Sequence, residues 1–104
     1  AFDTSCPLGP WIEVPEPGRE PLFSPGDAVV RARVDGRLVQ EGRTADMIRS
    51  IPELVAYIST IFTLLPGDVI LTGTPAGVGE IRPGQRVEVE VEGIGSFSNP
   101  VVRR

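Results

Sequence analysis

Residues 86–92 (RVEVEVE) alternate apolar and charged side chains without interruption. Because successive residues of a strand point to opposite faces of a sheet, this pattern predicts a β-strand with its valines on one face. One apolar face and one charged face are typical of an antiparallel sheet that covers a core on one side. We expect Glu88, Glu90 and Glu92 to lie on the solvated face. Alternate strand residues share a face, so a carboxylate metal site is the alternative.

A second strand is expected at residues 28–34, where the alternation is partial. Asp35 and Gly36 follow this strand and stand before another strand-like run at residues 37–40. An Asp-Gly pair between two such runs predicts a tight hairpin, because glycine adopts the positive φ that the turn requires.

One helix is expected after Ser50. Ser50 and Glu53 have the spacing of a capping box, in which each side chain accepts a hydrogen bond from the other residue's backbone N–H. Apolar side chains then recur at helical spacing as far as Leu65, where Pro66 and Gly67 stop the helix.

Two more short strands are expected, at residues 68–72 (DVILT) and near residues 96–102. The chain has 12 glycines and 11 prolines, which indicates many turns between short strands rather than long helices. A length of 104 residues predicts one domain, residues 1–104. We therefore expect an α+β fold that is mainly β, with one principal helix.

Composition excludes several classes of function. The net charge is −4 and there is no lysine, so a basic nucleic-acid-binding surface is not expected. The most apolar stretch, residues 54–65, is too short and too polar to cross a bilayer, and no signal peptide pattern opens the chain. We expect no membrane partner and a cytoplasmic location, which a single cysteine also fits.

The absence of histidine limits the chemistry of this chain. It excludes Ser-His-Asp and Cys-His catalytic sets and every His-ligated metal site. Cys6 then has no histidine to lower its pKa, so we expect a small buried hydrophobe rather than a nucleophile. Trp11 and Phe62 are expected in the core rather than on a binding platform.

Residues 73–79 (GTPAGVG) are expected to form a loop with three glycines. A turn that connects two strands without a ligand is one interpretation. The other is an anion site, because glycine-rich turns let backbone N–H groups converge and the Thr74 hydroxyl adds a donor. Pro75 would stiffen such a loop and reduce the ordering cost of binding. A phosphate-binding P-loop is excluded, since its Lys-Ser/Thr ending is absent.

Six motifs follow one another along the chain: residues 2–11 (FDTSCPLGPW), 34–36 (VDG), 44–48 (TADMI), 65–70 (LPGDVI), 72–79 (TGTPAGVG) and 91–95 (VEGIG). Each motif alone is weak, but the ordered set spans nearly the whole chain. In this order the motifs resemble the C-terminal half of the catalytic domain in the fumarylacetoacetate hydrolase superfamily. The acylpyruvate hydrolase and 2-hydroxyhepta-2,4-diene-1,7-dioate isomerase branch is the most similar.

The resemblance implies a mixed β-sandwich roll and a metal-dependent enzyme that acts on 2-oxo or enol diacids. The implied reactions are C–C hydrolysis, decarboxylation and double-bond isomerisation, as in the catabolism of aromatic compounds. The implied cofactor is Mg²⁺ or Mn²⁺, and members are commonly homodimers. The alternative is a non-catalytic module that binds a small carboxylate or mediates dimerisation.

Few site residues carry over from the family. Thr74, with Gly73 and Pro75, matches the loop that binds a substrate carboxylate. The family's metal ligands and active-site lysine precede the matched segment, so no metal ligand is assigned here, the catalytic residues are unknown, and we expect the isolated chain to be inactive. Asp3 and Thr4 adjoin the lysine position and are candidates for lining the pocket; local hydrogen bonds within a turn are the alternative.

The chain is expected to need a partner. It opens in mid-element at Ala1 without a start methionine, which suggests part of a longer polypeptide. Half a sandwich leaves strand edges open, so we expect a homodimer or pairing with the missing N-terminal half. Thr44, Asp46 and Met47 are expected to position the start of the helix, with substrate and subunit contacts left open.

Overall fold

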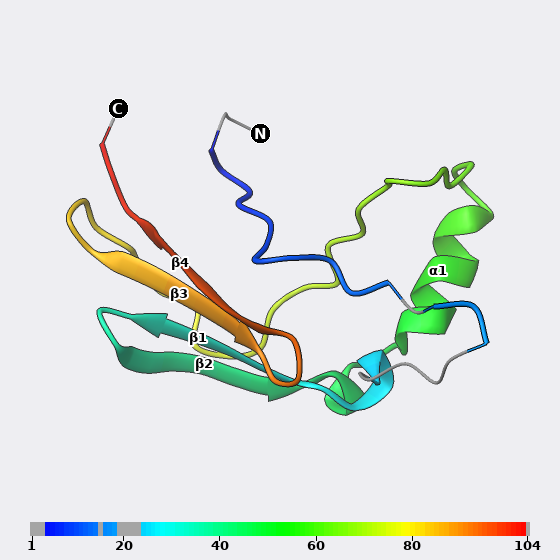
Figure 1. The fold of residues 1–104 in the computed structure, drawn as a ribbon, viewed down its shortest axis with the longest axis horizontal. Coiled ribbons are helices and arrows are strands. Elements are labelled where there is room, and N and C mark those ends of the chain that lie inside the picture. The colour runs from blue at the N-terminus through cyan, green and yellow to red at the C-terminus, as the bar shows by residue number, and fades with distance from the viewer. Residues whose placement is uncertain (1–3, 15, 19–23, 104) are drawn as a thin grey trace.

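The computed structural model describes residues 4–14, 16–18 and 24–103, which form one antiparallel sheet, one α-helix and two short 3₁₀ turns (Figure 1). The elements are η1 (Pro25–Asp27), β1 (Val29–Val34), β2 (Arg37–Arg43), η2 (Thr44–Asp46), α1 (Ile51–Ser59), β3 (Arg86–Val91) and β4 (Gly95–Pro100). The strand order is β2-β1-β3-β4. This confirms the predicted fold class, mainly β with one principal helix.

The hairpin between β1 and β2 forms where the Asp-Gly pair predicts it. Asp35 and Gly36 have φ values of 50° and 80°, and two successive positive φ values are the signature of a type I′ turn. The Asp35 side chain also ties the turn to β3, because its Oδ1 accepts from the Arg86 backbone N–H at 2.8 Å. The turn therefore fixes the register on both sides of β1.

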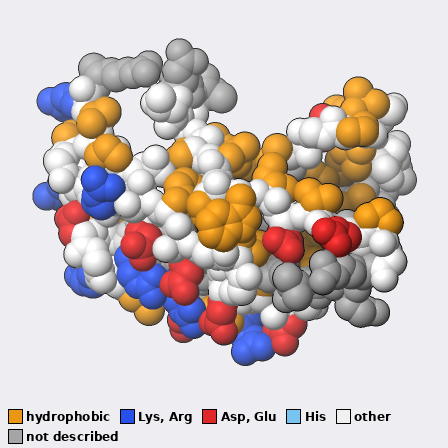
Figure 2. All heavy atoms as spheres, in the orientation of Figure 1, with side chains coloured by type: hydrophobic (Ala, Val, Ile, Leu, Met, Phe, Trp, Pro, Cys, Tyr) orange, Lys and Arg blue, Asp and Glu red, His pale blue; other side chains and the backbone are white. Residues whose placement is uncertain are grey.

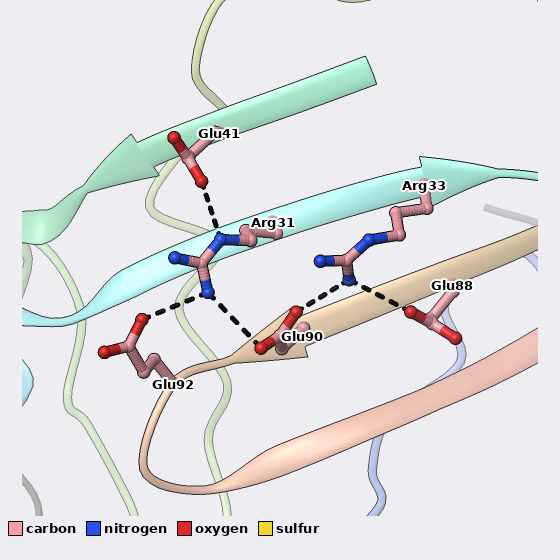
Figure 3. Close-up of polar contacts among 6 residues, drawn as sticks. All are labelled: Arg31, Arg33, Glu41, Glu88, Glu90 and Glu92. Atoms are coloured by element: carbon pink, nitrogen blue, oxygen red, sulfur yellow. Dashed lines mark hydrogen bonds and ion pairs between the residues drawn. The ribbon is translucent and has the colours of Figure 1, made fainter. Parts of the chain in front are cut away.

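The charged face of the sheet carries a cluster of ion pairs between β1 and its two neighbours (Figure 3). In the strand register, Arg31 stands opposite both Glu41 and Glu90, and Arg33 stands opposite Glu88. We call these residues, with Glu92, the arginine–glutamate cluster.

Within this cluster, Arg31 Nε donates to Glu41 at 2.6 Å, and Arg33 Nη1 donates to Glu90 at 2.7 Å and to Glu88 at 3.1 Å. Arg31 Nη1 also lies 3.0 Å from a Glu92 carboxylate oxygen. The face looks outward as predicted, but its carboxylates are paired with guanidinium groups rather than simply solvated. Opposite charges placed directly across a ladder stabilise the pairing of the strands.

The apolar face of the sheet has little cover. Ala28 is the one buried residue in the described part of the chain. The accessible surface is 8547 Å², whereas a folded monomer of 11.2 kDa exposes roughly 5,700 Å². Helix α1 stands beside the sheet instead of packing on it (Figure 1). Hydrophobic side chains gather around the resulting hollow (Figure 2).

Helix α1 begins as predicted but ends earlier. The capping box forms, with the Ser50 N–H donating to Glu53 Oε2 at 2.7 Å and the Glu53 N–H donating to Ser50 Oγ at 3.4 Å. The prediction that the helix continues to Leu65 is wrong, since it ends at Ser59. The Thr60 hydroxyl donates to the Tyr57 carbonyl at 2.7 Å, which competes with helical bonding at the end of α1. None of the helices in the described ranges is long and apolar enough to span a membrane.

Four other predictions fail because the apolar surface lacks cover. Residues 68–72 form no strand, since no described strand pairs with them. Trp11 and Phe62, expected in the core, are 58% and 65% exposed. Cys6, expected to be buried, is exposed. These predictions rest on an apolar run or on residue type, and neither shows whether the covering atoms belong to the same segment.

The arginine–glutamate cluster predicts a loss of stability in acid. The hydrogen bond from Arg33 lowers the pKa of Glu90, and burial offsets part of this effect. A carboxyl with a depressed folded pKa stabilises the fold above its unfolded pKa, and this contribution is lost as the pH falls through the folded value. We expect thermal stability to fall below about pH 4.3, where free glutamate titrates, and to fall less in Glu90→Gln.

The measurement is the melting temperature of the natural protein as a function of pH. Glu13→Gln, in the exposed N-terminal segment, is the control. The same acid dependence in Glu90→Gln and the natural protein would contradict the assignment.

Candidate carboxylate-binding loop

The loop of residues 73–79 lies against strand β2. The register of β1 and β2 passes from Ala32↔Gln40 to Arg33↔Leu38, so Val39 is an extra residue in the ladder. A bulge of this kind re-aims neighbouring side chains. Gln40, opposite Ala32, is thereby placed on the apolar face at the edge of the sheet, where the loop lies.

The Gln40 side chain joins strand and loop. Its Nε2 donates to Thr74 Oγ1 at 2.9 Å and to the Pro75 carbonyl oxygen at 2.7 Å. A backbone carbonyl only accepts hydrogen bonds, so the atom that faces Pro75 must be the amide nitrogen. One amide group therefore holds two adjacent residues of the loop.

Two glycines permit the close approach of loop and strand. A Cβ on Gly42 would stand 2.8 Å from Pro75 Cβ, closer than side chains pack. Gly77 has a φ of +105°, and a Cβ there would overlap the Val39 carbonyl oxygen. The loop thus rests on the backbone of β2 at the bulge.

The other side of the loop is open. Gly73, with a φ of +99°, and Thr74 are exposed, while Pro75 is half-buried against β2. No acceptor among the described residues takes the backbone N–H of Gly73, Thr74 or Ala76. A hydroxyl and backbone donors on one exposed turn provide hydrogen bonds suited to an anion.

The two remaining predicted site residues are Thr4, which is described, and Asp3. Thr4 is exposed and has a φ of 65°, and no hydrogen bond joins it to residues 73–75 in the part of the chain that is described. Asp3 lies outside the described residues. Pocket lining by Asp3 and Thr4 stays a prediction.

Thr44 has a structural contact of its own. Its Oγ1 accepts from the Ala28 backbone N–H at 2.8 Å, which fastens the segment after β2 to the start of β1. Asp46 closes the same 3₁₀ turn, η2, and Met47 follows it. The Thr44 contact fastens the segment to β1, and the prediction that the segment positions the start of the helix stays a prediction.

The next question is whether the described residues offer a set of ligands for a metal ion. The described residues contain no group of three or more His, Cys, Asp or Glu side chains that could hold one. Glu88, Glu90 and Glu92 share a face, but their carboxylates pair with Arg31 and Arg33. Bound guanidinium groups occupy the oxygens that a cation would need, so the alternative of a metal site at these glutamates does not fit.

A separate hollow lies between α1 and the segment that follows it. It measures about 480 Å³ and is lined mainly by apolar side chains, among them Ile58, Phe62 and Leu71. Its one carboxylate, Asp68, accepts from the Leu65 N–H at 2.7 Å. Uncovered apolar surface accounts for this hollow better than ligand chemistry does.

Gln40 is the site residue that sequence reasoning missed. The sequence indicates only that Gln40 ends the strand-like run at residues 37–40. A signal was present, since a polar residue there interrupts an otherwise apolar face. The bulge at Val39, which sets the facing of Gln40, has no mark in the sequence.

Comparisons with known proteins match nearly the whole chain. Residues 1–102 match the family model described as fumarylacetoacetate (FAA) hydrolase C-terminal. The 4-hydroxyphenylacetate degradation bifunctional isomerase/decarboxylase of Salmonella dublin is 44% identical over 100 residues, 96% of this chain and 22% of that protein.

Two solved structures are similar in fold and sequence. 2-Hydroxyhepta-2,4-diene-1,7-dioate isomerase from Mycobacterium marinum has a TM-score of 0.87 and 48% identity, covering 99% of this chain and 38% of that one. Maleylpyruvate hydrolase from Sphingobium sp. SYK-6, in complex with manganese(II) and pyruvate, has a TM-score of 0.86 and 36% identity, covering 98% and 37%. The chain spans less than half the length of each of these proteins.

Because the loop lies so close to β2, we expect substitution by alanine to lower the stability at one glycine of the loop and not at another. Gly77→Ala places a Cβ against Val39 at a positive φ, so we expect a loss of about 1–3 kcal/mol of stability and faster proteolysis at the loop. Gly79→Ala, whose Cβ would meet nothing within 4 Å, is the matched control and should behave as the natural protein does. Equal melting temperatures for the two variants would contradict the packing described.

Proposed function

The chain belongs to the fumarylacetoacetate hydrolase family, and on this basis we propose that it is the C-terminal part of the catalytic domain of an enzyme acting on 2-oxo or enol diacids. Residues 1–104 belong to a single domain in this proposal. The loop Gly73-Thr74-Pro75 binds a carboxylate of the substrate. The names of the relatives support an isomerase, decarboxylase or hydrolase of this kind.

One observation carries the proposed role of the loop. Thr74 is exposed on one side and held on the other by the Gln40 amide, 2.9 Å from its hydroxyl oxygen. A hydroxyl fixed in this way binds a carboxylate without first being ordered, which lowers the cost of binding. Hydrogen bonds to a charged acceptor contribute more than neutral ones, about 1.5–3 kcal/mol each.

The proposal includes a divalent metal held outside this chain. The manganese(II) and pyruvate in one related structure support Mg²⁺ or Mn²⁺ as the cofactor. The described residues contain no group of three or more His, Cys, Asp or Glu side chains that could hold it, so the proposal places its ligands in the N-terminal part of the domain. The role proposed for this chain is therefore confined to binding and orienting the end of the substrate.

The large exposed surface supports the proposal that another polypeptide segment covers this chain. The chain exposes about 2,800 Å² more than a folded monomer of its mass. A standard interface between two complete proteins covers about 800 Å² per partner. An excess this large fits a domain divided in two, so the N-terminal part of the same catalytic domain is the proposed cover, with a homodimer built on the completed domain.

The second candidate is a module that binds a small carboxylate or mediates dimerisation without catalysis. It is favoured by the absence of histidine and lysine from the sequence. The two candidates differ in what they predict for the full-length natural protein. Only an enzyme turns over a substrate there, whereas both predict that the isolated 104-residue chain is inactive.

Turnover separates these candidates. We expect the full-length natural protein, loaded with Mg²⁺ or Mn²⁺, to consume at least one acylpyruvate or 2-hydroxymuconate-like diacid. Consumption is measured as the change in ultraviolet absorbance of the enol. The same assay without metal is the control. A folded, metal-loaded protein that is inactive across the panel would reject the enzymatic proposal.

The carboxylate role of Thr74 is tested by calorimetry with oxalate, which resembles the enolate of a 2-oxo acid. In the Mn²⁺-loaded full-length protein, Thr74→Val removes one donor to a charged group and should weaken oxalate binding about 10–100-fold. Thr74→Ser keeps the hydroxyl and should stay close to the natural affinity. Unchanged affinity in Thr74→Val would mean that the loop does not bind the carboxylate.

A further inference from the structure

The two hydrogen bonds of the Gln40 amide determine which group donates in its contact with Thr74. Gln40 Nε2 carries two protons, and its neighbours at 2.9 Å and 2.7 Å are Thr74 Oγ1 and the Pro75 carbonyl oxygen. The carbonyl fixes which end of the amide faces the loop, because it cannot donate. Thr74 Oγ1 is therefore the acceptor in its bond with Gln40.

A threonine hydroxyl has one proton to donate and lone pairs to accept with. Once Oγ1 accepts from Gln40, the hydroxyl proton must point elsewhere, and on this loop the remaining side is solvent. Donation by the amide also polarises the hydroxyl and strengthens the bond that its own proton makes. The Thr74 hydroxyl is therefore oriented to donate a hydrogen bond to a ligand on the exposed side of the loop.

We propose that Gln40 is a positioning residue that fixes the Thr74 hydroxyl as a hydrogen-bond donor to a carboxylate of the substrate. The inference rests on the proposed function of the loop and adds a specificity determinant from β2. The ligand class that follows is an ionised carboxylate, since its oxygens only accept hydrogen bonds.

The fold around Gln40 supports this role. The bulge at Val39 aims the side chain onto the apolar face, and Gly42, on the same face two residues later, leaves room for Pro75. The loop is thus brought within reach of one polar side chain on that stretch of β2. A side chain that only filled space would need neither the amide group nor its orientation.

A double-mutant cycle tests whether Gln40 orients the Thr74 hydroxyl or only holds the loop through the Pro75 carbonyl. The variants are Gln40→Met, which has similar length and no donor, Thr74→Val, and the two combined, in the Mn²⁺-loaded full-length natural protein titrated with oxalate. Gln40→Met should weaken oxalate binding about tenfold in the natural background. In the Thr74→Val background the same change should cost less than about twofold, because the hydroxyl that it orients is gone.

Gln40→Glu is the second variant, because it keeps the shape of the side chain and reverses its hydrogen-bonding polarity. It should weaken oxalate binding more than Gln40→Met does, since it accepts the Thr74 proton and repels the anion. If Gln40→Met fails to fold, the cycle is run with Gln40→Glu and Thr74→Val.

The inference is overturned if Gln40→Met binds oxalate as the natural protein does, or if its cost is equal in both backgrounds, which would leave only a tether. Failure of the proposed function gives a different result, namely unchanged oxalate affinity in Thr74→Val alone. Circular dichroism and melting temperature of each variant show whether the fold is retained.

Discussion

The register between strands β1 and β2 is the constraint on which the rest of the structure depends. It places Arg31 opposite Glu41 on the charged face and Gln40 opposite Ala32 on the apolar face. A slip of one residue would exchange the two faces and remove both the ion pairs and the support of the loop. The type I′ turn at Asp35 and Gly36 sets this register together with the bulge at Val39, because the turn alone would bring Gln40 opposite Arg31 on the charged face.

This structure is held by hydrogen-bonded ladders and cross-strand ion pairs rather than by a core of its own. With Ala28 as the one buried residue in the ranges described, burial within the chain contributes little stabilisation. The loop is held by its contacts with β2, whereas the apolar side chains around the hollow between α1 and the segment that follows it are exposed. In the proposed function, the loop binds one end of the substrate and the N-terminal part of the domain covers these apolar side chains.

Sequence predicted local features well and features that depend on distant partners poorly. The RVEVEVE strand, the Asp-Gly turn and the capping box of Ser50 and Glu53 are all set by neighbouring residues, and each was confirmed. The strand at residues 68–72, the helix end at Leu65 and the burial of Trp11 depend on covering atoms, and these predictions failed. The glycines of residues 73–79 predicted the loop, and the resemblance suggested its role, whereas its support by Gln40 depends on a bulge that no sequence pattern marks.

A crystal structure of the full-length natural protein with Mn²⁺ and oxalate would test the role of the loop directly. We expect an oxalate oxygen within hydrogen-bond distance of Thr74 Oγ1, while Gln40 Nε2 still donates to Thr74 Oγ1 from the opposite side. Oxalate bound to the metal with Thr74 turned away, or with the Gln40 amide withdrawn from the loop, would contradict this role.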